Sequence, residues 1–286
     1  MKTHEQILSE IITEINKTAE SDYNYFHRKT MMIPSRKEII SILKNMQSVM
    51  FPDYFHLDEN EGKSAEEILD GIFIKLKRQL TAAYSFCNDC ECNDVVDTES
   101  IAYDILACIP KIKEYLIKDV QAIYEGDPAA RAPEEIILSY PGFYAVSIYR
   151  IAHEFYIRKI PYLARIMTEF AHEKTGIDIH AGATIGEYFF IDHGTGIVIG
   201  ETTTIGNNVK IYQGVTLGAK SFELDEDGNP IKGIKRHPDI GNNCIIYANA
   251  TILGGNTKIG DGTIIGGNVW LTHSVPAGEV VYYNAK

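Results

Sequence analysis

The sequence has no long apolar run, and its apolar stretches stay short of the ~18 residues that a membrane-spanning helix needs. Its first residues are amphipathic and mixed in charge, and they lack the apolar core of a signal peptide. Basic residues are few, with 27 Lys and Arg against 39 Asp and Glu and a formal net charge of -12. We therefore expect neither a membrane partner nor a nucleic-acid partner, because binding nucleic acid needs a basic face.

Cysteine is also scarce, with five residues at irregular spacing. Cys87, Cys90 and Cys92 lie close together in the stretch FCNDCEC, as metal ligands do. A fourth ligand and a second CxxC are missing, however, so we expect no metal site there. The odd number and irregular spacing predict a protein of a reducing compartment, which indicates the cytoplasm.

The composition is that of a globular protein with a sizeable core, with 45% hydrophobic and 23% charged residues in a chain of 286. Through the first part of the chain, apolar residues recur with the helical period. Ser64 and Glu67 form a capping box at the start of one such segment. Pro110 is expected to break or kink a helix that starts near Ser100. Residues 1–175 are therefore predicted to form an all-α helical domain.

From Gly176 onward the sequence repeats every six residues, and each unit begins with Ile or Leu. The fifth position is mostly small or β-branched, with Phe189 and Asn256 as exceptions. Such a unit forms a short strand and a tight corner, and its aliphatic side chain stacks inward on the next coil. The sequence thus predicts an α+β protein, in which a parallel β-helix at 176–286 follows the helices and is interrupted by an inserted loop, 219–239. The period alone leaves the hand of the coil open.

Three features interrupt the repeat, and chemistry is expected there. They are the pair Asp192–His193, the earlier Asp178, and the loop that ends in Arg236–His237. If three units make one coil, Asp178 and His193 fall on neighbouring coils, near enough for a hydrogen bond. A carboxylate on one imidazole nitrogen raises the basicity of the other, so this pair would form a general base.

Several stretches around these residues resemble one known family. IDHGTGIVIGETTTIG, GVTLGA and RHPDIGN, preceded by GDPAARA, YPGFYAVSIYRIAHEFY and DIHAGATIG, are similar to serine O-acetyltransferases over roughly residues 126–276. The resemblance implies a left-handed parallel β-helix after the helical domain. It also implies homotrimers formed through the β-helix, often paired into hexamers, with active sites between subunits.

The implied reaction transfers acetyl from acetyl-CoA to the hydroxyl of L-serine, giving O-acetyl-L-serine and CoA, the first step of cysteine synthesis. By the resemblance, His193 is the general base that takes the hydroxyl proton and returns a proton to the leaving sulfur. Asp178 is implied to orient His193. Acetyl-CoA is then a co-substrate, and no metal is expected.

The resemblance also assigns the residues that bind the substrates. Asp127 and Asp192 are implied to hold the serine ammonium, and Arg236 and His237 the serine carboxylate. A zwitterion needs anions at one end and cations at the other, and a guanidinium suits a carboxylate. The implied contacts with the pantetheine arm of CoA lie at four small residues, Gly218, Ala219, Ala248 and Gly267.

Two departures from the family are visible. The loop 219–239 is longer and more acidic than the short Gly-rich loop of the family. The sequence ends at Lys286, without the longer tail ending in Ile that many members insert into cysteine synthase. We therefore expect no cysteine synthase complex of that kind.

Other functions remain open at the level of sequence. A hexapeptide acyltransferase could act on a sugar or another hydroxyl acceptor, although a sugar needs no clamp for a zwitterion. A metal lyase on the same solenoid would need three converging histidines, and the repeat region offers His180, His193, His237 and His273. A non-catalytic or carbohydrate-binding solenoid is the third alternative.

Overall fold

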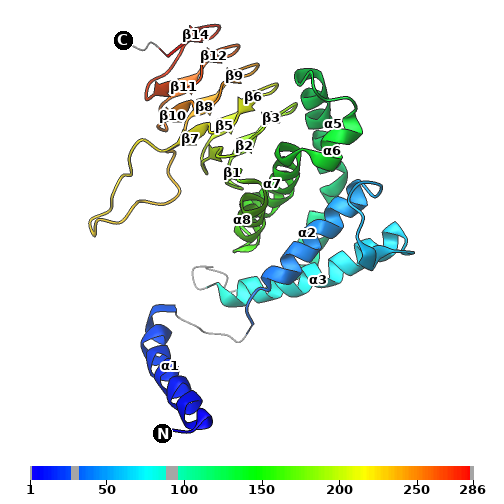
Figure 1. Cartoon of the computed structure of the whole chain (residues 1–286), viewed down its shortest axis with the longest axis vertical. Coiled ribbons are helices and arrows are strands. Elements are labelled where there is room, and N and C mark those ends of the chain that lie inside the picture. Colours follow the sequence, from blue (N-terminus) through cyan, green and yellow to red (C-terminus); the bar gives the residue numbers. More distant parts are fainter. Residues whose placement is uncertain (1, 27–31, 88–95, 284–286) are drawn as a thin grey trace.

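The computed structural model describes residues 2–26, 32–87 and 96–283. Helices occupy the first part of the chain, and α1 lies apart from the rest (Figure 1). The helices are α1 (His4–Phe26), α2 (Arg36–Met50), η1 (Asp58–Asn60), α3 (Ala65–Phe86), α4 (Thr98–Ala107), α5 (Ile109–Gly126), α6 (Pro133–Ser139), α7 (Pro141–Ile157) and α8 (Leu163–Thr175). None of the described helices is long and apolar enough to cross a membrane.

The helix boundaries follow local signals in the sequence. Ser64 and Glu67 form the predicted capping box, each side chain bonding the other's backbone N–H. The helix near Ser100 ends at Ala107, and Pro110 lies in the first turn of α5, where its missing N–H costs nothing. The expected break at Pro110 is therefore confirmed. The cysteine-rich stretch lies largely in 88–95, outside the described residues.

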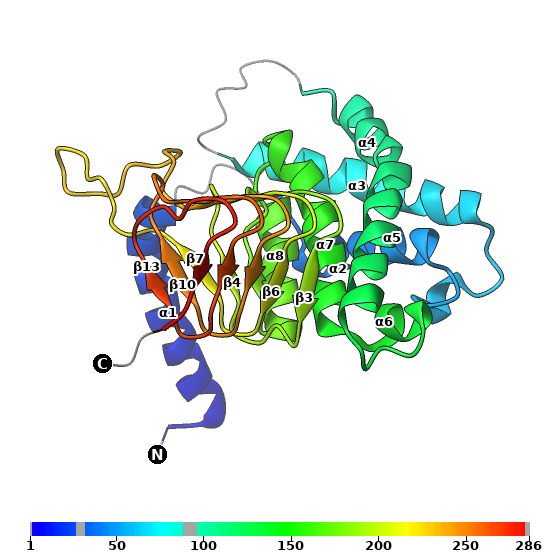
Figure 2. The same ribbon diagram turned by 90° about the horizontal axis from the view of Figure 1, so that it is seen from above.

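The second part of the chain is a parallel β-solenoid, as the hexapeptide period predicted (Figures 1 and 2). The strands are β1 (Asp178–Ile179), β2 (Thr184–Ile185), β3 (Phe190–Asp192), β4 (Val198–Ile199), β5 (Thr204–Ile205), β6 (Lys210–Tyr212), β7 (Thr216–Gly218), β8 (Asp239–Ile240), β9 (Ile245–Ile246), β10 (Thr251–Leu253), β11 (Lys258–Ile259), β12 (Ile264–Ile265), β13 (Trp270–Leu271) and β14 (Val280–Val281).

The strands form three parallel sheets, one on each side of the solenoid. Sheet A has the order β1-β4-β7-β10-β13, sheet B the order β2-β5-β8-β11, and sheet C the order β3-β6-β9-β12-β14. The first-position aliphatic residues stack inside, as Ile179, Ile199 and Leu217 do along sheet A, where each is buried. The columns of inward aliphatics thus form the solenoid core.

The coils are not all the same length. Asp178 pairs with Val198, twenty residues later, because the corner around Gly194 carries two extra residues. Val198 pairs with Thr216, at the regular spacing of eighteen. The inserted loop then leaves the solenoid after β7 and projects away from it, shown in yellow in Figure 2. Both irregularities lie next to residues that the sequence singled out.

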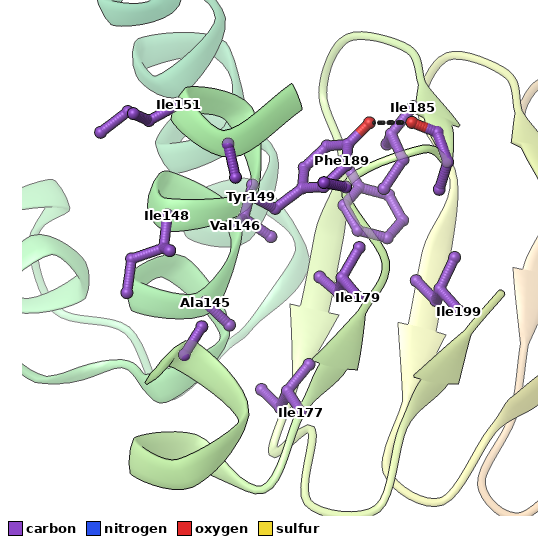
Figure 3. Close-up of a cluster of buried hydrophobic side chains, with 14 of the residues drawn as sticks. Ala145, Val146, Ile148, Tyr149, Ile151, Ile177, Ile179, Ile185, Phe189 and Ile199 are labelled. Carbon is purple, nitrogen blue, oxygen red and sulfur yellow. Dashed lines mark hydrogen bonds between the residues drawn. The ribbon is translucent and has the colours of Figure 1, made fainter. Parts of the chain in front are cut away.

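Helix α7 covers the end of the solenoid nearest the helices (Figure 3). Tyr149 packs against Ile179 and Phe189, and its hydroxyl donates to the Ala183 carbonyl at 2.6 Å. This contact satisfies a carbonyl that the first coil would otherwise leave unpaired.

A buried ion pair strengthens the same joint. Arg150 on α7 donates to both carboxylate oxygens of Asp119 on α5, at 2.5 and 2.8 Å. Arg150 also donates to the Gly186 carbonyl at 2.8 Å, and Asp119 accepts from the backbone N–H of Phe189 at 2.9 Å. One buried core runs from the helices into the solenoid. Helices and solenoid are therefore packed as one unit at this joint, and the boundary predicted at residue 175 remains a prediction.

Candidate active site

The corner between sheets C and A holds Asp192 and His193. β3 ends at Asp192, and His193 follows with a left-handed backbone, φ 56°. A residue other than glycine in this conformation costs about 1 kcal/mol or more and is enriched at functional sites. The His193 side chain is 69% exposed, so packing does not explain its position.

Asp178 lies next to this corner through its backbone. Its N–H donates to the Ile197 carbonyl at 2.9 Å. In this structure, with both residues inside the described ranges, no hydrogen bond joins the Asp178 and His193 side chains. The carboxylate beside the imidazole belongs to Asp192, whose Oδ1 lies 3.5 Å from His193 Nδ1. The orienting role of Asp178 stays a prediction. Within a single chain, the acid that contacts the His193 imidazole is Asp192.

Asp127 comes to the same corner from the end of α5. Its Oδ1 accepts from the Ala129 backbone N–H at 2.8 Å, and its Oδ2 accepts from the Tyr140 hydroxyl at 2.6 Å. The bond to Asp127, followed by burial, raises the pKa of Tyr140 to about 12, and the charge of Asp192 acts in the same direction. Both carboxylates therefore lie near Tyr140. We call Asp127, Tyr140, Asp192 and His193 the base corner.

A column of residues rises from His193 along the same edge of the solenoid. Asp192 is in register with Tyr212, so Gln213 follows one coil above His193. Ala248 and Gly267 occupy the next two coils, and a Cβ on Gly267 would lie 3.2 Å from the Ala248 carbonyl. Gln213 Oε1 is buried without a hydrogen-bond partner among the described residues, so one acceptor beside the base corner is open.

The opposite corner, between sheets A and B, gathers the predicted cations. Arg236 forms an ion pair with Glu201, which follows β4, and Tyr156 of α7 donates to Glu201 at 2.7 Å. Thr202 Oγ1 accepts from the backbone N–H groups of Arg236 and His237, at 3.0 and 3.1 Å. We call Tyr156, Glu201, Thr202, Arg236 and His237 the cation corner.

His237 is held there as a neutral imidazole. The Thr202 backbone N–H donates to Nδ1 at 3.1 Å, so the ring proton lies on Nε2. Burial, followed by the charge of Arg236, lowers the pKa of His237 to about 4. A Cβ on Gly200 would lie only 2.2 Å from Nε2, so only glycine leaves room for the ring. The Nε2–H is thus a fixed donor beside a guanidinium.

The two corners of one chain are separated by the width of sheet A. A side of six residues at ~3.3 Å per residue spans roughly 15–20 Å. Gly218 and Ala219 lie on the side of the cation corner, at the end of β7, whereas Ala248 and Gly267 lie above His193. The structure therefore divides both predicted binding sets between two edges of the same chain.

Of the histidines considered for a metal site, His180 lies near His237, whereas His193 lies at the other corner. Within the described ranges, no three His, Cys, Asp or Glu side chains are grouped as metal ligands. His180 is tied to its own turn, where its Nδ1 accepts from the Gly182 N–H at 3.0 Å. The polar side chains at the two corners form hydrogen bonds and ion pairs with protein groups.

A hexapeptide solenoid with an exposed histidine beside carboxylates and an edge of small residues defines an acyltransferase of the hexapeptide class. Residues 76–147 match the model for the family described as "Serine acetyltransferase, N-terminal". A relative from Synechococcus elongatus named "Serine acetyltransferase, plasmid" is 45% identical over 260 residues. The match covers 87% of this chain and 81% of the relative. The chain belongs to the serine acetyltransferase family.

Solved structures agree with this assignment. Entamoeba histolytica serine acetyltransferase 1 in complex with L-cysteine aligns with a TM-score of 0.71 and 40% identity, over 84% of this chain and 86% of that one. Neisseria gonorrhoeae serine acetyltransferase in complex with serine aligns with a TM-score of 0.57 and 28% identity, over 86% of this chain and 95% of that one. The helical region and the solenoid thus both have counterparts in the family.

Proposed function

We propose that the chain transfers acetyl from acetyl-CoA to the hydroxyl of L-serine, giving O-acetyl-L-serine and CoA. One observation carries the proposal: the Asp127 and Asp192 carboxylates lie at the corner of the exposed His193, and a guanidinium and a neutral imidazole donor lie at the other corner. This charge pattern matches a zwitterionic amino acid with a reactive hydroxyl. The serine-bound Neisseria enzyme and the cysteine-bound Entamoeba enzyme are relatives whose ligands have that form.

In this mechanism His193 is the general base. Its imidazole takes the proton of the serine hydroxyl as the oxygen attacks the thioester carbonyl of acetyl-CoA. The tetrahedral intermediate collapses with loss of the CoA sulfur, which receives the proton back from His193. Asp178 and Asp192 are the carboxylates that orient the ring, and general base catalysis contributes about 10²–10⁴ in rate.

The substrate is held at its two charged ends. Asp127 and Asp192 accept hydrogen bonds from the ammonium group, while Arg236 and the Nε2–H of His237 donate to the carboxylate. Since the two corners of one chain lie on opposite edges of sheet A, the site is completed by the cation corner of a neighbouring copy. A closed ring of three copies, a homotrimer, provides this contact three times.

The same arrangement suits acetyl-CoA as co-substrate. Ala248 and Gly267 line the edge above the base corner of one copy, and Gly218 and Ala219 line the edge above the cation corner of the next. Small residues on both edges leave a narrow channel in which the pantetheine arm can approach backbone groups. The thioester would then reach His193 from the far end of the solenoid.

The test is the release of CoA from acetyl-CoA by the purified protein with L-serine, homoserine or a galactoside as acceptor. We expect rapid turnover with L-serine and little with the galactoside, because a sugar has no charged ends for the two corners. A protein that folds and trimerises but turns over a galactoside or homoserine in preference to L-serine would contradict the proposal.

A further inference from the structure

Tyr140 is the first residue of the stretch YPGFYAVSIYRIAHEFY, but the sequence assigned it no role. It is the single residue between α6 and α7, the C-cap of the first helix and the N-cap of the second. Its hydroxyl donates to Asp127 Oδ2 at 2.6 Å, while Asp127 Oδ1 is held by the Ala129 N–H at 2.8 Å. Both carboxylate oxygens of Asp127 are therefore fixed in direction before any ligand binds.

The junction is itself fixed against the base corner. Pro141 begins α7, and a Cβ on Gly142 would lie 2.7 Å from the backbone oxygen of Ile191. Glycine thus lets the start of α7 approach the strand that ends in Asp192 and leads into His193. Tyr140 connects the carboxylate of Asp127, from the helical region, to the corner that carries the base.

The donor on Asp127 is neutral, whereas the acid at the cation corner is paired with a guanidinium. Glu201 at the cation corner is neutralised by Arg236. Within the described ranges, no lysine or arginine forms an ion pair with Asp127 or Asp192. A phenol orients a carboxylate without cancelling its charge, so the base corner keeps its negative charge for a cationic ligand group.

We propose that Tyr140 is a positioning residue that sets the preference for acceptors with an α-ammonium group, an inference that rests on the proposed serine acetylation. By holding Asp127 in place beside Asp192, it presents two carboxylates at a fixed spacing to one ammonium. Hydrogen bonds to charged groups are the strong ones in proteins, so losing this bond costs affinity for the ammonium end. The base His193 is not touched by Tyr140, and the chemical step is left intact.

The experiment compares Tyr140→Phe with wild type, using L-serine and 3-hydroxypropionate as acceptors. The second acceptor has the same hydroxyl and carboxylate but no ammonium. For L-serine we expect KM to rise about 10-fold or more, with kcat within about threefold. For 3-hydroxypropionate we expect kcat/KM to change less than about twofold, since no group of that acceptor uses Asp127.

Tyr124→Phe on the exposed face of α5 is the matched control, because it removes a phenol without touching the base corner. Thermal unfolding of both variants reports any loss of fold. An equal fall in kcat/KM for both acceptors, or a fall in kcat alone, would overturn the role of Tyr140 while serine turnover by wild type upholds the proposed function. Wild-type protein without serine turnover would overturn both.

Discussion

The base corner and the cation corner lie at opposite edges of sheet A, and their histidines differ in how far they are buried. At the cation corner, His237 is only 7% exposed, and its ring is bonded to Thr202 and wedged against Gly200. At the base corner, His193 is 69% exposed in a left-handed backbone. At the cation corner the histidine is buried and hydrogen-bonded within a single chain, whereas at the base corner it is exposed to solvent.

The difference shows what each corner lacks. Arg236 already has a carboxylate partner in Glu201, so a substrate carboxylate has to share or replace it. Asp127 and Asp192 have no Lys or Arg partner among the described residues, and the side chains beside them are the Tyr140 phenol and the His193 imidazole. Among the described residues, the acids of the base corner therefore have no Lys or Arg partner, whereas Glu201 at the cation corner does.

The largest effect is expected from His193→Asn, which removes the proposed base and keeps a residue that tolerates the left-handed backbone. Asn249 and Asn268 already adopt this conformation between sheets C and A in later coils, with φ 61° and 60°. The rate of CoA release should fall by about 10²–10⁴, with no loss of thermal stability. A variant that keeps more than a tenth of the wild-type kcat would show that His193 is not the base.

Gly200→Ala should damage the cation corner. The added Cβ would lie about 2.1 Å from His237 Cδ2, so the ring has to move away from its bond with Thr202. We expect KM for L-serine to rise about 10- to 100-fold, as for the loss of a donor to a charged group. The control is Gly71→Ala on α3, where no atom lies within 4 Å. An unchanged KM in Gly200→Ala would show that His237 does not bind the serine carboxylate.

The buried imidazole also makes stability depend on pH. Burial, followed by the charge of Arg236, lowers the pKa of His237 from 6.5 to about 4. Between these values the unfolded chain binds the proton that the folded chain does not, so the free energy of unfolding falls as the pH falls. Going from pH 7 to pH 5, the contribution is about 1–2 kcal/mol.

Denaturant unfolding at the two pH values, in wild type and His237→Asn, measures this contribution. Asparagine keeps an acceptor near the Thr202 N–H but does not titrate. The variant should therefore lose less stability than wild type between pH 7 and pH 5. An equal loss in both proteins would place the pH dependence elsewhere in the molecule.

The smallest effect is expected from Tyr156→Phe. The Tyr156 hydroxyl donates to Glu201 at 2.7 Å and so supports the acid that holds Arg236. Removing one such bond should raise KM for L-serine about three- to tenfold, with kcat unchanged. A fall in kcat without a change in KM would mean that Tyr156 acts on the chemical step and not on binding.

The solenoid could be predicted from the sequence because an Ile or Leu recurs at the first position of every hexapeptide. Each coil repeats the same inward column, and residues such as Ile179 and Ile199 stack as the hexapeptide pattern requires. The break at Pro110 and the cap at Ser64 follow from local backbone chemistry in the same way. These signals need no knowledge of distant contacts.

The hydrogen bonds of Tyr140 and Tyr156 to the site acids could not be predicted from local sequence patterns. Tyr140 meets Asp127 through a helix junction, and Tyr156 meets Glu201 across 45 residues. Tyr140 and Tyr156 begin and end the stretch YPGFYAVSIYRIAHEFY, but that motif does not say which acid each hydroxyl meets in the fold. The first coil has twenty residues because of the corner at Gly194, so counting hexapeptides does not give the distance between the Asp178 and His193 side chains.

The claim that one serine is held between the base corner of one copy and the cation corner of another can be tested by mixing inactive chains. His193→Asn has an intact cation corner, and Arg236→Gln has an intact base corner. The two variants are refolded or expressed together at equal amounts, and CoA release with acetyl-CoA and L-serine is measured. With random assembly into trimers, about one site in four combines two intact corners.

We predict that the mixture recovers about a quarter of the wild-type rate, although each variant alone is nearly inactive. Recovery requires that the intact corners come from different chains. A mixture that assembles into mixed trimers and stays as inactive as the separate variants would show that both corners of a site belong to one chain, and it would contradict the account.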